Sequence, residues 1–383
     1  MLCGPTNDGG DSRSDCAIRL LIVRAKSCSL SSSMMRLLLV AALAAAASTS
    51  SINRTGPFSS KVACEHSEPF AAASAGVPIL LIGGQGGSGT RGVHELFVNS
   101  GIVQLVDSTK RTKNSMALRQ SGLTGLATPL FAEIRAQNGS MAPVSEHFFY
   151  SLETLDARHI SPKVAAEVRT AICRLKGLLL PEFSAFHASG EFKWIALKEP
   201  YLMFLLPLLL HMLPHARFLH LTRDVRTVHR FHDQGTTTFQ RKLYGLDGLA
   251  KLDESISQTC TALPHAGRDR LRAIAVWADT QRGLMAWAVR ELGPPAYRHL
   301  RVEDVYLKRD GKQIQALFAW LDVDLPLPFV ERLLAGVCRK RHNYWVSKRD
   351  RRDQGLSRWV DQVAGDVLDH MGYSRPELGG ARK

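Results

Sequence analysis

A glycine-rich turn that directly follows an apolar run is the feature that most constrains the fold of this chain. The run spans Val77 to Ile82, and the turn reads Gly83-Gly84-Gln85-Gly86-Gly87-Ser88-Gly89-Thr90-Arg91. A buried strand that passes through such a turn into a helix aims several backbone N–H groups at one point, at the positive end of the helix dipole. The sequence therefore predicts a strand, turn and helix that together bind an anion.

A second anion-binding feature follows another apolar run. The segment Arg217 to Thr222 leads directly into Arg223-Asp224-Val225-Arg226. Two arginines at the end of a strand supply positive charge and several N–H donors for a second anion. One nucleotide that carries two separate phosphate groups would use both features.

After Ala75, apolar runs alternate with helical periodicity, which is typical of a parallel sheet with helices on both faces. We predict an α/β domain over residues 76–375 with a central, mainly parallel sheet of about five strands in three layers, and a disordered tail over 376–383. The stretch from Ser108 to Pro143 is polar and is expected to form loops and short helices. The predicted strands are Val77–Ile82, Ile102–Val106, Trp194–Lys198, Arg217–Thr222 and His299–Val302, and the main predicted helices are Gly92–Asn99, Pro162–Leu180, Tyr201–Leu213 and Gly267–Leu292.

The first 75 residues differ in character and indicate a targeting segment. No acidic residue occurs between Cys16 and Cys64, and the apolar run Leu37 to Ala47 is followed by small residues. This run is too short to span a bilayer, which takes about 20 residues, but it fits the apolar region of a signal peptide. A start at Met34 or Met35 would bring it close to the N-terminus, and an organelle transit peptide is the alternative.

Glycosylation sequons and cysteines bear on the compartment. Sequons begin at Asn53 and Asn138, so we expect a glycoprotein of the secretory pathway, in the Golgi lumen or secreted, with another organelle or the cytoplasm as alternatives. Seven cysteines are present, and none are spaced like a zinc or redox pair, so we predict no metal. The four beyond residue 50 form either one or two disulfides or thiols; they are Cys64, Cys173, Cys260 and Cys338.

A formal net charge of +14 favours anionic partners such as nucleotides, polyanionic glycans, nucleic acid or acidic membranes, and a solvated basic surface is the alternative. The apolar segment Tyr201 to Leu213 is interrupted by Pro207 and His211. It is therefore expected to be a core helix, and we predict no transmembrane segment in the domain.

The glycine turn can be compared with two known nucleotide-binding loops. A nucleoside triphosphatase loop requires lysine at the position of Thr90, so ATP or GTP hydrolysis is not expected. A dinucleotide-binding loop fits Gly84, Gly86 and Gly89, with Asp107 placed to bind a ribose. An NAD(P)-dependent oxidoreductase therefore remains an alternative, although it has no evident use for Arg223.

Six short segments occur in a familiar order: Ser88-Gly89-Thr90, Lys198-Glu199-Pro200, Arg223-Asp224-x-Arg226, Arg301-Val302-Glu303-Asp304-Val305, Leu317-Phe318-Ala319-Trp320-Leu321 and Met371-Gly372-Tyr373. Together they resemble the sulfotransferase family. The resemblance implies a P-loop-like fold and transfer of a sulfuryl group from 3′-phosphoadenosine 5′-phosphosulfate to a hydroxyl or amine. It further implies no nucleic-acid partner, and an acceptor that we expect to be a carbohydrate or a small molecule. The oligomeric state stays unknown.

The resemblance also implies which residues bind the donor. Arg223 would bind its 3′-phosphate, together with Arg339 and Lys340, for which a solvated basic surface is the alternative. The 5′-phosphosulfate would be held by the turn residues Gly86, Gly87, Ser88, Gly89, Thr90 and Arg91.

For catalysis, the resemblance places Lys198 beside the transferred group, although a solvent-facing lysine is the alternative. Ser145-Glu146-His147-Phe148-Phe149 resembles a segment of glycan sulfotransferases in which a glutamate is the base, so Glu146 is one candidate base. Asp107 is a second candidate because strand ends face the crevice of an open sheet. For both carboxylates an ordinary structural role remains an alternative.

Two positions depart from the family pattern. Gly87 replaces the usual Lys or Arg, a loss that Arg91 could cover, and Phe231 replaces a serine whose phosphate contact His229 or His232 could supply. These departures leave a catalytically inactive, anion-binding relative as a further alternative.

Overall fold

In the computed structural model, five parallel strands form a sheet in the order β2-β3-β1-β4-β5. The strands are β1 (Ile79–Gly83), β2 (Val103–Leu105), β3 (Trp194–Lys198), β4 (Arg217–Thr222) and β5 (Tyr297–Arg301). The predicted α/β class is confirmed, and each predicted strand is found with its ends shifted by two residues or fewer. The structure describes residues 63–85, 89–106, 114–138, 146–155, 158–225, 244, 249–254, 256–258, 265–339 and 354–373.

The central strand β1 illustrates why the strands of this sheet consist of uninterrupted apolar residues in the sequence. Its five residues are all buried. Ile79 and Leu81 belong to the core on one face of the sheet, whereas Leu80 and Ile82 belong to the core on the other face. Successive side chains of a strand point to opposite faces, so a sheet that is covered on both sides requires apolar residues at every position.

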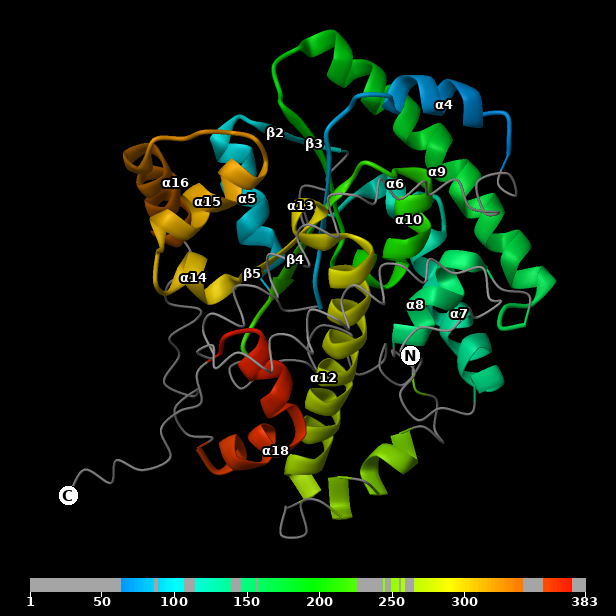
Figure 1. Ribbon diagram of the computed structural model, residues 1–383, viewed down its shortest axis with the longest axis vertical. Coiled ribbons are helices and arrows are strands. Elements are labelled where there is room, and N and C mark those ends of the chain that lie inside the picture. The colour runs from blue at the N-terminus through cyan, green and yellow to red at the C-terminus, as the bar shows by residue number, and fades with distance from the viewer. Residues whose placement is uncertain are drawn as a thin grey trace, which may run out of the picture. The chain divides into compact units, whose positions relative to one another are not determined.

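One face of the sheet is covered by four helices, which Figure 1 shows on the left. They are α5 (Thr90–Ser100), α14 (Val302–Tyr306), α15 (Gly311–Trp320) and α16 (Leu327–Arg339). Phe97 of α5 meets Phe318 of α15 edge to face, with ring centroids 5.7 Å apart. The indole of Trp194 in β3 donates a hydrogen bond to the carbonyl of Leu321 at 2.6 Å. The first contact joins α15 to α5, the helix after the glycine turn, and the second joins the end of α15 to strand β3.

More helices pack on the opposite face of the sheet, mostly on the right in Figure 1. The 16 residues of α7 exceed the predicted loops and short helices, because Ala127, Leu130, Phe131 and Ile134 form a buried helical stripe within a polar stretch. The predicted core helix at Tyr201 to Leu213 is divided into a 3₁₀ turn and α10. The elements are α4 (Ser67–Ser74), α6 (Met116–Gln120), α7 (Leu123–Asn138), α8 (Glu146–Thr154), α9 (Pro162–Ser189), η1 (Pro200–Leu205), α10 (Leu206–Met212), α12 (His265–Glu291) and α13 (Gly293–Ala296).

A disulfide between Cys64 and Cys173 fastens the start of the described chain to α9, with the two Cα atoms 6.1 Å apart. Phe70 of α4 and Phe183 of α9 pack beside each other in the same region, with ring centroids 5.4 Å apart. Of the two states left open for these cysteines, the structure therefore has the bonded one. Cys260 lies outside the described residues.

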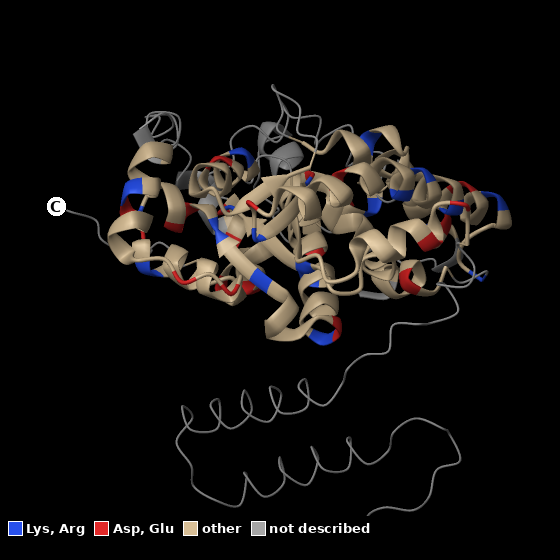
Figure 2. Cartoon of the chain, turned by 90° about the horizontal axis from the view of Figure 1, so that it is seen from above, with Lys and Arg blue, Asp and Glu red and all other residues tan. Residues whose placement is uncertain are grey.

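The last described helix, α18 (Gln354–His370), packs against α12 in a third core. Arg282 of α12 crosses this contact by an ion pair with Asp366 of α18 at 2.7 Å, and it also pairs with Asp279 of its own helix at 2.7 Å. Among the described residues, no helix is long and apolar enough to cross a membrane. Basic and acidic positions are interspersed along the described elements (Figure 2), so the excess of basic residues does not by itself mark one docking face.

Candidate active site

The carboxyl ends of β3, β1 and β4 lie side by side at one edge of the sheet. In the register, Ile82 of β1 pairs with Lys198 of β3 and with Leu219 of β4. Neighbouring strands are about 4.8 Å apart, so the glycine turn, Lys198 and Arg223 all emerge at this edge. The strand order puts the segments that follow β1 and β4 on neighbouring parallel strands, and their joint binding of one ligand stays a prediction.

The glycine turn is held close to its neighbours. A Cβ on Gly83 would lie 3.0 Å from the Phe218 ring and 3.2 Å from a backbone nitrogen. Gly84 donates its N–H to the carbonyl of Pro200 at 3.0 Å. Gly89 has φ +79°, a left-handed conformation that favours glycine, and it directly precedes α5. The turn therefore depends on its glycines for both conformation and close approach.

The start of α5 is fixed by helix α14. The hydroxyl of Tyr306 donates to the carbonyl of Gly89 at 3.4 Å. Gly92 lies so close to this hydroxyl that an added Cβ would overlap it. Thr90 is buried in the first turn of α5, whereas Arg91 is exposed.

Lys198, at the end of β3, is almost completely buried, with 2% of its surface exposed. Its ammonium donates to the side-chain oxygen of Asn114 at 2.6 Å. The next residue, Glu199, is also buried and accepts a hydrogen bond from Arg119 at 3.2 Å. Burial raises the pKa of the Glu199 carboxyl above its usual range, while the positive charge of Arg119 acts in the opposite direction.

The turn after β4 is held by a chain of polar contacts. Glu303 accepts the backbone N–H of Asp224 at 2.9 Å and the hydroxyl of Tyr373 at 3.2 Å. The Tyr373 hydroxyl also lies 3.0 Å from the hydroxyl of Thr222. Burial raises the pKa of Glu303, and Arg223 beside the turn is 9% exposed. The position of this turn therefore depends on Glu303 of α14 and on Tyr373, which follows α18.

Two histidines lie behind this turn, between β4 and β5. Nε2 of His299 is 2.5 Å from the Thr222 hydroxyl, and Nδ1 of His220 is 3.0 Å from the Tyr297 hydroxyl. Burial lowers the pKa of His299 to about 4 and places the pKa of His220 well below its usual range. Both rings are therefore neutral at pH 7, and they contribute hydrogen bonds rather than charge.

A comparison with protein families matches residues 78–326 to the sulfotransferase family. The chain belongs to the sulfotransferase family. Members of this family are transferases that use 3′-phosphoadenosine 5′-phosphosulfate as the sulfuryl donor, so the chain is an enzyme of that class. Comparison with curated proteins found no significant match. The matched residues include all five strands and the turns that follow β1, β3 and β4.

Several predicted site residues of this sulfotransferase lie outside the described residues, so their roles remain predictions. Glu146 begins α8 and Arg339 ends α16, and only their backbones are described. The residues outside the description are Gly86, Gly87, Ser88, Asp107, His232 and Lys340.

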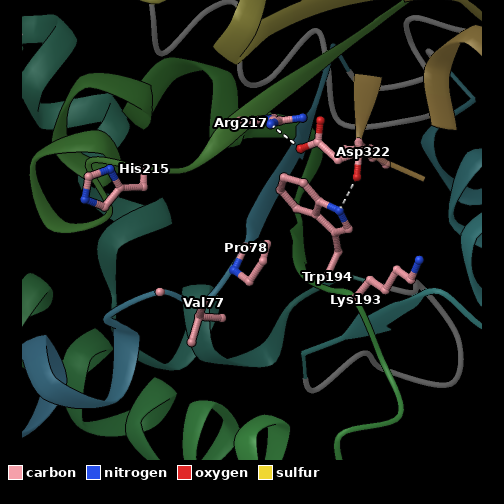
Figure 3. Close-up of a pocket in the computed structure, with 9 residues that line it drawn as sticks. Val77, Pro78, Lys193, Trp194, His215, Arg217 and Asp322 are labelled. Atoms are coloured by element: carbon pink, nitrogen blue, oxygen red, sulfur yellow. Dashed lines mark hydrogen bonds and ion pairs between the residues drawn. The ribbon is translucent and has the colours of Figure 1, made fainter. Parts of the chain in front are cut away.

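A cavity of about 380 Å³ lies at the other edge of the sheet (Figure 3). Its lining includes Pro78, Lys193, Trp194 and Arg217, which precede or begin β1, β3 and β4. The guanidinium of Arg217 lies over the Trp194 ring at 4.9 Å and pairs with Asp322 at 2.6 Å. Since these residues are at the amino ends of the strands, the cavity is separate from the edge that carries the glycine turn.

Sequence reasoning did not single out Asn114, Arg119 or Glu303 as parts of the site. Glu303 falls within a segment that resembles the family, but that resemblance gave it no role. Asn114 lies in the stretch from Ser108 to Pro143 that was predicted as loops and short helices, with no helix start placed. Ser115, which caps α6 by accepting the N–H of Leu118 at 3.4 Å, is the sequence signal that could have placed a helix start here.

Proposed function

We propose that this sulfotransferase transfers a sulfuryl group from 3′-phosphoadenosine 5′-phosphosulfate to a hydroxyl group of a carbohydrate or a small molecule. One observation supports the proposal: the start of the glycine turn, the buried Lys198 and Arg223 stand at or directly after the carboxyl ends of three adjacent parallel strands, β1, β3 and β4. In open α/β sheets, ligands bind in the crevice at this edge. The donor has two separate anionic groups, and the edge offers two separate cationic features.

In the proposed complex, the amides of the glycine turn and the N-terminus of α5 bind the 5′-phosphosulfate. Arg223 binds the 3′-phosphate. Because Arg223 is 9% exposed, water and salt screen its charge less than they screen a surface arginine. Arg339 and Lys340 would add charge at the same phosphate.

The proposed reaction is an in-line displacement at sulfur. The acceptor oxygen forms the new O–S bond while the S–O bond to the 5′-phosphate breaks, and negative charge develops on that departing oxygen. The ammonium of Lys198 stabilises this charge by donating a hydrogen bond. A carboxylate, Glu146 or Asp107, takes the proton of the acceptor hydroxyl. The products are the sulfated acceptor and 3′-phosphoadenosine 5′-phosphate.

Calorimetry with 3′-phosphoadenosine 5′-phosphate tests donor binding. The wild type should bind this bisphosphate much more tightly than AMP, and Arg223→Ala should raise its Kd by about 100-fold, as expected when a buried charge-assisted contact to phosphate is lost. Arg217→Ala is the matched control, because Arg217 begins the same strand at the opposite edge. It should lower stability and leave the Kd unchanged. Equal Kd values for wild type and Arg223→Ala would refute the proposal.

The same titrations address the other candidates. Tighter binding of NADH than of the bisphosphate would favour an oxidoreductase. Gly87 stands where the family pattern has a basic residue, and this departure favours an inactive relative as the second candidate. Bisphosphate binding without sulfuryl transfer, either to water or to a broad panel of hydroxyl acceptors, would support that candidate.

We further propose that the enzyme works in the lumen of the secretory pathway. The Cys64–Cys173 disulfide supports this, because disulfides form and persist in oxidising compartments and are rare in the cytosol. Peptide mapping of protein from its native cells without reductant should recover the two cysteines as one linked peptide pair. Recovery of both as free thiols would contradict the proposal.

A further inference from the structure

We propose that Asn114 is a positioning residue for sulfuryl transfer, holding the ammonium of Lys198 toward the departing oxygen. This inference rests on the proposed function and adds to it a residue that the family resemblance does not supply. Asn114 and Lys198 are 84 residues apart in the sequence. The fold brings them together at the carboxyl end of β3.

The contact is short and buried. The Nζ atom of Lys198 lies 2.6 Å from Oδ1 of Asn114, and the two residues are 2% and 6% exposed. Hydrogen bonds in such an environment are electrostatically stronger than hydrogen bonds in water. A lysine side chain has four rotatable bonds, and a fixed acceptor at its tip selects one direction for the amine. Asn114 therefore supplies one fixed, buried acceptor that orients the ammonium of Lys198.

The backbone around Asn114 is fastened to the same strand end. Ser115 donates its N–H to the carbonyl of Lys198 at 2.8 Å. Farther along α6, Arg119 pairs with Glu199 at 3.2 Å. Three contacts thus join the short segment 114–119 to two consecutive residues of the β3 end. The amide of Asn114 consequently keeps its place relative to the lysine amine.

The chemistry of the amide suits this task. An amide oxygen accepts a hydrogen bond but carries no net charge, so it orients the ammonium without cancelling the charge that the reaction uses. A carboxylate at position 114 would also orient the amine, yet it would form an ion pair and reduce the field at the departing oxygen. The distinction between amide and carboxylate makes the inference testable.

The experiment compares the wild type with Asn114→Ala, Asn114→Asp and Lys198→Met. Because the acceptor is unidentified, the reaction measured is transfer of the sulfuryl group from isotopically labelled donor to water, which yields sulfate and the bisphosphate. A second readout, which needs no turnover, is the ¹H–¹⁵N signal of the Lys198 ammonium in lysine-labelled protein, assigned by its loss in Lys198→Met. A buried, hydrogen-bonded amine exchanges its protons slowly with water and is therefore visible.

Asn114→Ala should lower kcat between about 10- and 100-fold through misplacement of the amine, and the KM for the donor should change by less than about 3-fold. Its ammonium signal should shift or broaden. Asn114→Asp keeps the volume and the hydrogen bond, so the signal should persist while kcat falls because the charge is neutralised. Unchanged kcat in both Asn114 variants, with Lys198→Met inactive, would overturn the inference.

Ser115→Ala is the matched structural control. It removes the cap of α6 next to Asn114 but leaves the backbone contact to Lys198 in place. It should lower the melting temperature and preserve both kcat and the ammonium signal. If Ser115→Ala lowers kcat as much as Asn114→Ala, local loosening explains the effect and the inference fails.

Failure of the proposed function has a different signature. In that case the wild type would neither bind the bisphosphate nor release sulfate from the donor. If the wild type does both and Lys198→Met retains the full rate, donor use stands and the positioning role of Asn114 is refuted.

Discussion

Acidification should destabilise the fold through His299, a partly buried histidine of β5 that faces Thr222 of β4. Burial is the main cause that lowers the pKa of His299 to about 4. The positive charges of Arg301 and His370 act in the same direction, and the negative charge of Asp304 opposes them. The neutral ring lies 2.5 Å from the hydroxyl of Thr222, so it contributes to the network behind the Arg223 turn.

The sign follows from proton counting. In the unfolded chain the imidazole has its ordinary pKa of 6.5, so between pH 6.5 and about 4 the unfolded state binds a proton that the folded state does not. Stability contributed by neutral His299 is therefore complete above pH 6.5 and is lost as the pH falls to about 4. The difference between a pKa of 6.5 and a pKa of about 4 corresponds to about 3.5 kcal/mol at about 1.4 kcal/mol per pKa unit, and about 3 kcal/mol of this is lost between pH 6.5 and pH 4. Buried His220 acts in the same direction.

The assay is urea unfolding at several pH values across this window, with the disulfide kept oxidised. His299→Gln is the comparison variant, because an amide can replace the hydrogen bond to Thr222 but does not titrate. Carboxylates contribute equally to the pH dependence of stability in both proteins. The difference between the two free energies of unfolding therefore reports the titration of the imidazole alone. The wild type should lose about 3 kcal/mol more than the variant between the two ends of the window. Equal losses would refute the argument that burial keeps this ring neutral.

Three further substitutions test other parts of the structure. Replacing Cys64 and Cys173 by serine should lower the free energy of unfolding in urea by about 4 to 5 kcal/mol, since the disulfide closes a loop of 109 residues. The reduced wild type should have the same free energy of unfolding as the double variant. A clear difference between the two would contradict this explanation. Gly92→Ala should cost about 1 to 3 kcal/mol in thermal unfolding, because its Cβ overlaps the hydroxyl of Tyr306; an unchanged melting temperature would show that α5 can shift freely. Glu303→Ala removes the carboxylate that accepts the backbone N–H of Asp224 beside Arg223, so the Kd for the bisphosphate should rise about 10-fold in calorimetry. Glu303→Gln keeps an acceptor oxygen, so its Kd should stay close to that of the wild type. An equal rise in both variants would indicate that loss of this hydrogen bond does not weaken the binding.

The strands could be predicted from the sequence because a strand that is buried on both faces consists of consecutive apolar residues. Leu80, Leu81 and Ile82 face alternate cores, so no polar residue interrupts the run. Helix α7 was missed because its apolar stripe lies among polar and small residues. The strand order could not be read from the runs, because the pairing of β1 with β3 and β4 joins segments that lie far apart in the sequence.

The same limit applies to the site. Strand ends and glycine turns have local signals, and these led to Arg223, whereas Lys198 was found through the resemblance to the family. Their partners have none, since Asn114 contacts a residue 84 positions away and Glu303 contacts one 79 positions away. A single asparagine in a polar stretch has no periodicity or spacing that distinguishes it. Only the three-dimensional structure reveals hydrogen-bond partners such as Asn114 and Glu303, which lie far away in the sequence.

Strand β4 begins with one arginine, Arg217, and is directly followed by another, Arg223. The two side chains lie at opposite ends of the strand and in different surroundings. Arg217 is immobilised between the rings of Trp194 and Trp320. Arg223 borders the crevice where substrates are expected. We therefore expect substitutions at Arg217 to change stability and substitutions at Arg223 to change donor binding, so that β4 offers separate positions for engineering the two properties.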